Sequence, residues 1–325
     1  MNSSKIFNKT TEKEFEALAL EVFSFQYTNN PIYSEFCQHL GATPKNIKKI
    51  SQIPFLPIAF FKSKRVVLNN QKAEIIFTSS GTTGSNTSKH IVTDVNLYEQ
   101  SYLAAFKHFY GNIEDYCILA LLPSYLEREG SSLIYMVNDL IEKSNHPDSG
   151  FYLHDLNSLK SKLIELENKK INVLLIGVSF ALLDMAENHP MQLNHTIVME
   201  TGGMKGKRKE MIREELHQIL KKGFGVPKIH SEYGMTELLS QAYSKGEGVF
   251  KTPPWMKIMI RDTEDPLTLQ PIGKTGGINV IDLANINSCS FIATQDLGKV
   301  YHDGSFEILG RFDHSDIRGC NLMVL

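Results

Sequence analysis

The sequence FTSSGTTGSNTSKH, at residues 77–90, directly follows the apolar pair Ile75–Ile76. Glycine allows backbone turns that aim several amide groups at one anion, and Ser and Thr add hydroxyl donors without adding charge. A loop of this kind, placed after a strand and before a helix, suits phosphate binding. It is not a Walker A loop, because Gly81 is followed five residues later by Asn86. A flexible Ser/Thr/Gly linker has the same composition, so this stretch alone leaves both interpretations open.

On both sides of this loop the chain alternates between short apolar runs and helical patterns. The run at 117–122 is almost continuously apolar, which is typical of a strand buried on both faces of a parallel sheet. The patterns predict strands at 66–68, 74–77, 117–122, 172–176, 196–199 and 228–230, and helices within 11–40 and at 96–109, 132–143, 156–169, 180–188 and 205–222. This alternation indicates an α/β fold with a mostly parallel sheet.

Three regions of the sequence differ in composition and in the pattern of their apolar residues. We expect a helical segment over residues 1–50, an α/β core over 51–248, and a β-rich subdomain over 249–325, where short apolar pieces alternate with Asp, Gly, Pro and Asn. No internal repeat or low-complexity tract is visible.

Composition excludes several classes of function. The 34 Lys and Arg residues nearly balance the 36 Asp and Glu residues, so the sequence gives no basis for a nucleic-acid partner. No run of 18 apolar residues and no signal-like N-terminus occurs, which predicts a cytoplasmic protein without membrane insertion. The four cysteines form no CxxC pair, so we expect reduced thiols and no zinc knuckle; they are Cys37, Cys117, Cys289 and Cys320.

Three later stretches carry polar residues suited to a nucleotide. In SEYGMTE at 231–237, the carboxylate of Glu237 could hold Mg²⁺ between phosphate oxygens. In TQDLG at 294–298, Asp296 could accept hydrogen bonds from ribose hydroxyls, and in GRFD at 310–313, Arg311 could pair with a nucleotide oxygen. Taken singly, each stretch is equally an ordinary surface feature, namely a solvated turn, a turn aspartate or a surface salt bridge.

In this order, however, the four stretches resemble the motifs of the adenylate-forming enzymes, which include acyl-CoA ligases, peptide-synthetase adenylation domains and luciferases. A narrower resemblance, to the acyl-protein synthetases of bacterial luminescence, extends over nearly the whole chain. It is carried by NNPIYSEFC, IPFLPIAFFKS, FTSSGTTG, LLPSYLEREGSSL and RGCNLMV. The resemblance implies the large N-terminal domain of an adenylate-forming enzyme, with mostly parallel sheets, flanking helices and a β-rich C-terminal subdomain, without the small C-terminal domain.

The resemblance also implies a reaction and its residues. ATP with Mg²⁺ would convert a carboxylic acid, expected to be a fatty acid, into an acyl adenylate, and the acyl group would then move to Cys320 and to an acyl-accepting protein such as a reductase or carrier protein. Thr236 would lie beside the α-phosphate, Glu237 would hold Mg²⁺, and Asp296 and Arg311 would bind the ribose. The phosphates would contact Ser79, Ser80, Gly81, Thr82, Thr83 and Gly84, and the adenine would lie between Tyr233 and the Gly202–Gly203 turn.

Two departures from the family pattern leave alternatives open. The chain ends at Leu325, so we expect the lysine of the usual C-terminal domain to be absent. The next lysine after the loop, Lys89, comes five residues after Gly84, which is out of place for the usual loop lysine, so its role stays open. A non-catalytic nucleotide-binding subunit of a biosynthetic complex is one alternative. A serine hydrolase is another, because GVSFA at 177–181 approaches the nucleophile elbow GxSxG, with Ser179 as nucleophile and His230 as base. The chain length of the acid and the final acceptor stay undetermined.

Overall fold

A computed structural model describes residues 5–7, 11–79, 87–122, 130–153, 155–202, 208 and 211–312. Within these residues, twelve strands form one mixed sheet in the order β11-β12-β13-β14-β10-β9-β8-β7-β6-β4-β5, with β1 paired to β13. The strands are β1 (Leu56–Pro57), β4 (Cys117–Leu121), β5 (Gly150–Phe151), β6 (Val173–Val178), β7 (Thr196–Thr201), β8 (His230–Tyr233), β9 (Ala242–Ser244), β10 (Val249–Lys251), β11 (Met256–Arg261), β12 (Thr275–Asp282), β13 (Phe291–Val300) and β14 (Phe306–Arg311). A separate hairpin joins β2 (Ile75–Thr78) to β3 (Lys89–Val92).

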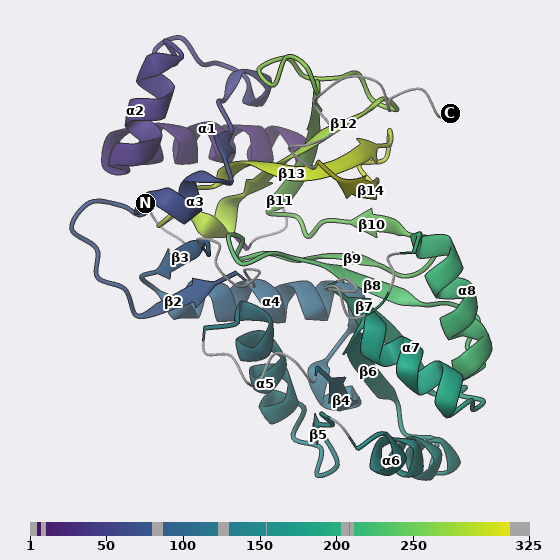
Figure 1. The fold of residues 1–325 in the computed structure, drawn as a ribbon. Helices are drawn as coiled ribbons and strands as arrows, with labels where there is room; N and C mark the ends of the chain where they lie inside the picture. Colours follow the sequence, from purple (N-terminus) through teal and green to yellow (C-terminus); the bar gives the residue numbers. More distant parts are fainter. Residues whose placement is uncertain are drawn as a thin grey trace.

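The parallel part of the sheet is an α/β unit. Strands β5, β4, β6, β7 and β8 pair in parallel, and every residue of β4 and β6 is buried. The helices of this part are α4 (Val95–Tyr110), α5 (Ser132–Ser144), α6 (Leu156–Asn168), α7 (Ser179–Asn188) and α8 (Arg213–Phe224). Figure 1 shows α7 and α8 together beside β6 and β7. These two helices pack closely because Gly223 lacks a Cβ, which would stand 2.5 Å from the Cβ of Ala186.

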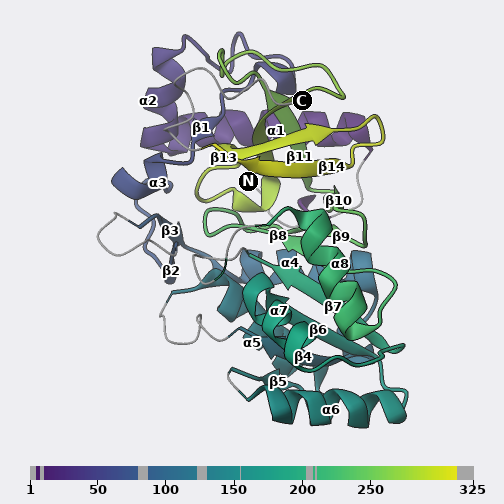
Figure 2. The ribbon, with the colours of Figure 1, turned by 45° about the vertical axis from the view of Figure 1, so that its right-hand side comes forward.

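The N-terminal helices lie against the antiparallel part of the sheet, far from them in sequence. They are α1 (Glu12–Asn29), α2 (Pro31–His39) and the single turn α3 (Phe60–Ser63). Gln26 of α1 donates to the backbone oxygens of Asn285 (3.0 Å) and Ile286 (2.8 Å) and accepts from the backbone of Ser290 (3.0 Å). In Figures 1 and 2, α1 and α2 accordingly lie beside β11–β14.

The predicted fold class is confirmed, with three local corrections. The sheet is mixed, because strands β8 to β14 pair antiparallel. Residues 66–68 form no strand: the backbone of Leu68 donates to Asn287, and the Ser288 hydroxyl donates to the backbone of Val66, so a loop takes the place of a partner strand. The predicted helix 205–222 begins only at Arg213, since residues 211–212 are extended.

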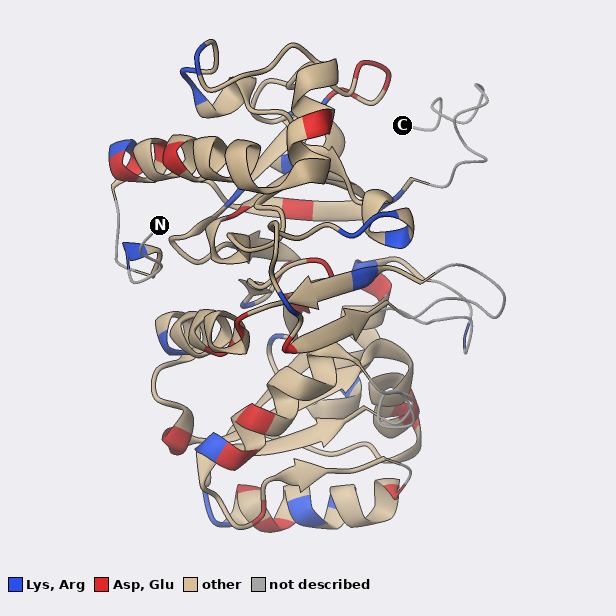
Figure 3. Ribbon diagram, turned by 90° about the vertical axis from the view of Figure 1, so that its left-hand side faces the viewer, with Lys and Arg blue, Asp and Glu red and all other residues tan. Residues whose placement is uncertain are grey.

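The surface carries charges of both signs. In the view of Figure 3, Lys and Arg alternate with Asp and Glu along several outward-facing helices. None of the helices in the described ranges is long and apolar enough to cross a membrane.

Candidate active site

The residues on either side of the hydroxyl-rich loop, Ser79 and Ser88, are hydrogen-bonded to each other. The backbone amide of Ser79 donates to the carbonyl of Ser88 (3.1 Å), and the amide of Ser88 donates back to the Ser79 hydroxyl (2.9 Å). These bonds extend the β2–β3 pairing by one step and close the neck of a loop that leaves after Ser79. Ser79 therefore lies at the neck of the predicted phosphate loop, whereas Ser80, Gly81, Thr82, Thr83 and Gly84 lie outside the described residues.

The turn that contains Thr236 and Glu237 lies against this neck. The Ser88 side chain hydrogen-bonds to the Glu237 carboxylate, and Nδ1 of His90 donates to the carbonyl of Thr236 (2.8 Å). Asn285 completes the contact, because its Oδ1 is 3.0 Å from Nε2 of His90 and its Nδ2 donates to the carbonyl of Glu237 (2.7 Å). Strand β3 thus fixes the loop neck and the turn to each other.

The Glu237 side chain is only 5% exposed. Burial raises its pKa above the usual carboxyl range, and the hydrogen bond from Ser88 opposes that rise. The carboxylate also accepts from its own backbone amide. A carboxylate can accept about four hydrogen bonds, so Glu237 has spare acceptor capacity, and hard oxygen ligands of this kind are what Mg²⁺ prefers.

A second group of predicted residues meets between β8 and β13. The Tyr233 hydroxyl donates to Oδ2 of Asp296 (2.7 Å), and Nε of Arg311 lies 3.5 Å from Oδ1 of the same carboxylate. The β13–β14 register places Asp296 opposite Arg311. Burial raises the pKa of Asp296, while the Tyr233 hydroxyl lowers it. Arg311 is 71% exposed, so its guanidinium can reach a ligand beside Asp296.

The third predicted element follows β7. Gly202 has a φ of 68°, which glycine adopts without strain, and it turns the chain at the carboxyl end of the strand. Because β7 and β8 are parallel neighbours, this turn and Tyr233 lie at the same edge of the sheet, where ligands of α/β folds bind. Gly203 lies outside the described residues.

Ser179 does not have the partners of a hydrolase nucleophile. Its hydroxyl, on a residue only 2% exposed, faces the Glu200 carboxylate (3.2 Å) and the carbonyl of Gly202 (3.0 Å), both acceptors. The proposed base, His230, instead pairs its Nδ1 with the Tyr110 hydroxyl (3.2 Å). In the described residues Ser179 therefore supports the turn after β7, and the nucleophile–base pair of the hydrolase alternative is missing.

The structure thus brings the predicted residues together in two adjoining groups, linked by residues 233–237. Ser79, Thr236 and Glu237 form one, and Tyr233, Asp296 and Arg311 form the other. Cys320 lies outside the described residues. Sequence reasoning assigned no role to Ser88, His90 or Asn285. Ser88 and His90 stand at the end of the stretch 77–90, beyond the part that resembles a phosphate loop, and Asn285 stands in no motif.

Known proteins are similar in sequence to this chain, over part or most of its length. Residues 4–123 match the family model described as "Acyl-protein synthetase, LuxE". A long-chain-fatty-acid–luciferin-component ligase of Vibrio harveyi is 23% identical over 92% of this chain and 84% of that protein. The chain is thus similar to acyl-protein synthetases in its N-terminal part and, at low identity, over most of its length. A second ligase with the same description, from Photorhabdus luminescens, is 36% identical over 74 residues, which are 22% of this chain and 63% of that protein.

Solved CoA ligases have a fold similar to that of this chain. A 2-hydroxyisobutyryl-CoA ligase in complex with 2-HIB-AMP and CoA superposes with a TM-score of 0.67 at 13% identity, covering 95% of this chain and 77% of that one. ATP-bound MatB from Rhodopseudomonas palustris superposes with a TM-score of 0.53 at 17% identity over 75% of this chain. The chain spans about half the length of MatB, 49%. These likenesses concern the fold.

Proposed function

We propose that this chain uses ATP to activate a carboxylic acid, a long-chain fatty acid like that named for its relatives, and then transfers the acyl group to a thiol. One observation carries the proposal. Ser79, Asp296 and the pair Tyr233 and Glu237 come from three separate stretches of the sequence, and hydrogen bonds join these residues into two adjoining groups at the carboxyl end of the parallel strands.

The chemistry has two balanced steps. A carboxylate oxygen of the acid attacks the α-phosphorus of ATP, the bond to the bridging oxygen breaks, and pyrophosphate leaves. A thiolate then attacks the acyl carbonyl, the bond to AMP breaks, and a thioester and AMP remain. Both steps require that anionic groups be neutralised and aligned, which is the contribution of the protein.

Different residues would neutralise and align the phosphates, the ribose and the adenine. Amide and hydroxyl groups of the loop that leaves at Ser79 would hold the phosphates, with Thr236 beside the α-phosphate. Asp296, held by Tyr233, would accept from the ribose hydroxyls, and Arg311 would pair with a nucleotide oxygen. The loop residues assigned to this role are Ser79, Ser80, Gly81, Thr82, Thr83 and Gly84, and those beside the adenine are Gly202, Gly203 and Tyr233.

Glu237 fits a magnesium ligand. It is buried, it has spare acceptor capacity, and it lies at the neck of the loop where phosphates would enter. When bound there, Mg²⁺ would neutralise phosphate charge and orient the phosphate oxygens. Ser88 would keep the carboxylate pointed at the loop.

Among the cysteines, Cys320 is the proposed acyl carrier. The other three are buried, and burial raises the pKa of Cys37 to about 12 and that of Cys117 to about 11, and raises that of Cys289 as well. A buried neutral thiol is a poor nucleophile, because the thiolate is the reactive form. Arg318, two residues before Cys320, would favour the thiolate there.

The proposal is tested by incubating the protein with Mg·ATP and a radiolabelled fatty acid. We expect acid-dependent release of pyrophosphate and a protein-bound label that neutral hydroxylamine removes. Cys320→Ser should release pyrophosphate but carry no label, and Cys37→Ser serves as the matched control. Labelling of Cys320→Ser would overturn the carrier role. ATP binding without acid-dependent pyrophosphate release would instead support a non-catalytic nucleotide-binding subunit.

A further inference from the structure

The proposed chemistry has no use for one fully buried carboxylate, that of Asp282, the last residue of β12. The residue is 0% exposed, and in the described part of the chain no lysine, arginine or histidine forms an ion pair with it. A buried carboxylate is unfavourable unless hydrogen bonds or a cation compensate for the water that it loses. The hydrogen bonds that Asp282 accepts therefore show what this residue holds in place.

Four donors from two segments of the chain surround the Asp282 carboxylate. Oδ2 accepts from the backbone amides of Leu239 (2.8 Å) and Ser240 (3.0 Å), and Oδ1 accepts from the Ser240 hydroxyl (2.6 Å) and from the amide of Ala284 (3.1 Å). A carboxylate accepts about four hydrogen bonds, so its capacity is used within the fold. Burial raises the pKa of Asp282, and these hydrogen bonds oppose that rise. The carboxylate therefore holds chain segments together and has no acceptor left for a ligand.

The segment that Asp282 holds begins at the proposed magnesium ligand. Leu239 and Ser240 follow Glu237 by two and three residues. The short turn after β12 also holds Glu237 itself, because Nδ2 of Asn285 donates to the Glu237 carbonyl (2.7 Å). Residues 282–285 therefore fasten the segment 237–240 at both of its ends.

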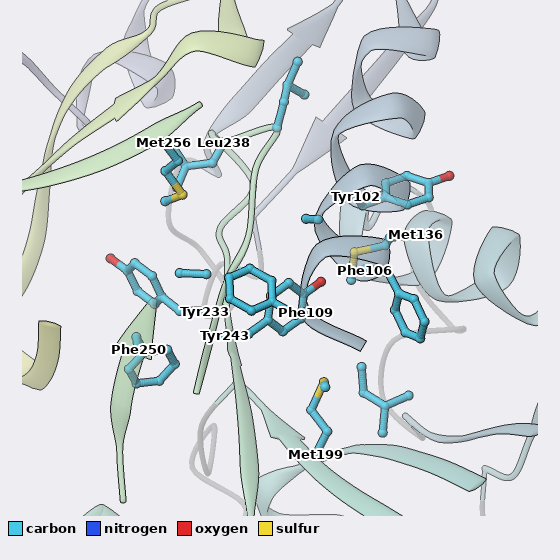
Figure 4. Packing of buried hydrophobic residues seen from close by; sticks show 14 of the residues in the cluster. Tyr102, Phe106, Phe109, Met136, Met199, Tyr233, Leu238, Tyr243, Phe250 and Met256 are labelled. Carbon is cyan, nitrogen blue, oxygen red and sulfur yellow. The ribbon is translucent and has the colours of Figure 1, made fainter. Parts of the chain in front are cut away.

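Ser240 also connects the two halves of the fold. Besides its bond to the carboxylate, its hydroxyl accepts from the indole Nε1 of Trp255 (3.0 Å) and lies 3.0 Å from the hydroxyl of Ser101. Ser101 belongs to α4 of the parallel half, whereas Trp255 directly precedes β11 of the antiparallel half. Figure 4 shows the buried side chain of Leu238 pointing towards Met256, the first residue of β11. Polar and apolar contacts thus fix this segment at the boundary between the halves.

The backbone of Asp282 connects it to the strand that carries the proposed ribose ligand. Its amide donates to the carbonyl of Ser290 (2.8 Å), which directly precedes β13, and β12 and β13 pair along their length. Asp296 belongs to β13. Glu237, in contrast, belongs to no strand or helix. Asp282 is therefore the point at which the turn with Glu237 is fastened to the sheet with Asp296.

We propose that Asp282 is a positioning residue, which sets the separation between the carboxylates of Glu237 and Asp296 so that both meet one nucleotide. The inference rests on the proposed function and adds to it the residue that aligns its two groups. If the bonds to Asp282 are lost, the Glu237 turn loses its attachment to the sheet, and its carboxylate shifts relative to the phosphates. A displacement of about 1 Å can lower the rate of a reaction by roughly a hundredfold.

Two variants and one control test this role. Asp282→Asn keeps the shape of the side chain, but it turns an amide group towards donors that need an acceptor. Ser240→Ala removes one donor and leaves the carboxylate in place, so it decides the question if Asp282→Asn does not fold. Tyr33→Phe is the matched control, because it removes a buried hydroxyl that donates to the carbonyl of Pro54 (2.7 Å) beside α2.

Calorimetry of ATP binding with and without Mg²⁺ gives the ratio of the two Kd values, and thermal unfolding gives the stability of each variant. We expect the ratio to fall by roughly tenfold in Asp282→Asn and in the same direction, by less, in Ser240→Ala. Acid-dependent pyrophosphate release should fall with it. Tyr33→Phe should lower the melting temperature but keep the wild-type ratio.

A double-mutant cycle separates positioning from stability. If Asp282 acts through Glu237, Asp282→Asn should change the ratio little further in a Glu237→Gln background, because both substitutions remove the same interaction. An equal loss in both backgrounds would overturn the inference, and so would a wild-type ratio in Asp282→Asn or Ser240→Ala, or ATP binding in the wild-type protein that does not depend on Mg²⁺. If no acid supports pyrophosphate release, the proposed function fails, and the calorimetric ratio still decides the role of Asp282.

Discussion

The Tyr233 hydroxyl donates a 2.7 Å hydrogen bond to Asp296, although 63 residues separate the two in the chain. This bond joins the last parallel strand, β8, to the antiparallel strand β13. The carboxylate proposed to bind ribose is thus held by a residue of the other half of the sheet. Its position does not depend on a nucleotide being present, and such preorganisation favours binding.

Tyr233→Phe removes this donor while it preserves the ring and its packing. We expect the KM for ATP to rise by roughly tenfold, since hydrogen bonds to charged groups contribute about 1.5–3 kcal/mol. Steady-state kinetics with ATP varied at saturating acid measure the change. Tyr301→Phe is the control, because it also removes a tyrosine hydroxyl, but one that hydrogen-bonds to Glu307. An unchanged KM for ATP in Tyr233→Phe would contradict the role of the Tyr233–Asp296 pair in nucleotide binding.

The substitution Glu237→Gln should lower activity without lowering the stability of the fold. We expect Mg²⁺-dependent pyrophosphate release to fall by about two orders of magnitude, as is usual when one preorganised electrostatic group is lost. The melting temperature should stay equal or rise, because burial already disfavours the charged form of Glu237 at neutral pH. Thermal unfolding beside the activity assay gives both numbers, and Glu264→Gln on an exposed turn is the matched control. Full activity in Glu237→Gln would contradict the assignment.

Ser179→Ala tests the support role of that hydroxyl. Loss of its bonds to Glu200 and Gly202 should lower the free energy of unfolding by about 1–2 kcal/mol. Pyrophosphate release should persist, with a raised KM for ATP if the Gly202 turn shifts. Denaturant titration and ester hydrolysis assays check the two parts: an esterase activity lost in Ser179→Ala would restore the hydrolase alternative.

The buried His90 predicts a pH effect on stability. It is 1% exposed, and burial lowers its pKa from about 6.5 to about 4 in the folded chain. The unfolded chain therefore binds a proton more readily between these values. The contribution of neutral His90 to the free energy of unfolding is fully present above pH 6.5. This contribution is lost as the pH falls towards 4, by up to about 3 kcal/mol.

Urea titrations at several pH values between 7 and 4 measure this slope. His90→Gln should be less stable at pH 7 but should lose less stability on acidification than the wild type. His39→Gln, at an exposed helix end, is the matched control for the exchange of a histidine for a glutamine. Parallel curves for wild type and His90→Gln would show that the buried ring does not titrate as described.

Much of the fold could be read from periodicity. The continuous apolar run that became β4 and the amphipathic pattern of α6 arise from local burial, so neighbouring residues carry the signal. Residues 66–68 have the same apolar character but form no strand. Their backbone partners, Asn287 and Ser288, lie more than two hundred residues away, and no local pattern encodes them.

In the candidate site, too, some residues can be proposed from local sequence patterns and others cannot. Residues in ordered motifs, such as Tyr233 and Asp296, can be proposed from the sequence because several short signals reinforce one another. His90 and Asn285 hold the Thr236–Glu237 turn through bonds across 146 and 48 residues, which only the folded chain reveals. Sequence patterns thus locate chemistry more readily than the polar contacts that position it.

The contact between α1 and the 285–290 segment has a consequence for synthesis. Gln26 leaves the ribosome early, but its partner Asn285 follows 259 residues later. At about 5–20 residues per second, the helix waits on the order of ten to fifty seconds for the surface that covers it. During that interval the apolar face of α1, which includes Phe15 and Phe23, is without its final neighbours. Translation speed and chaperone access therefore bear on the yield of this protein.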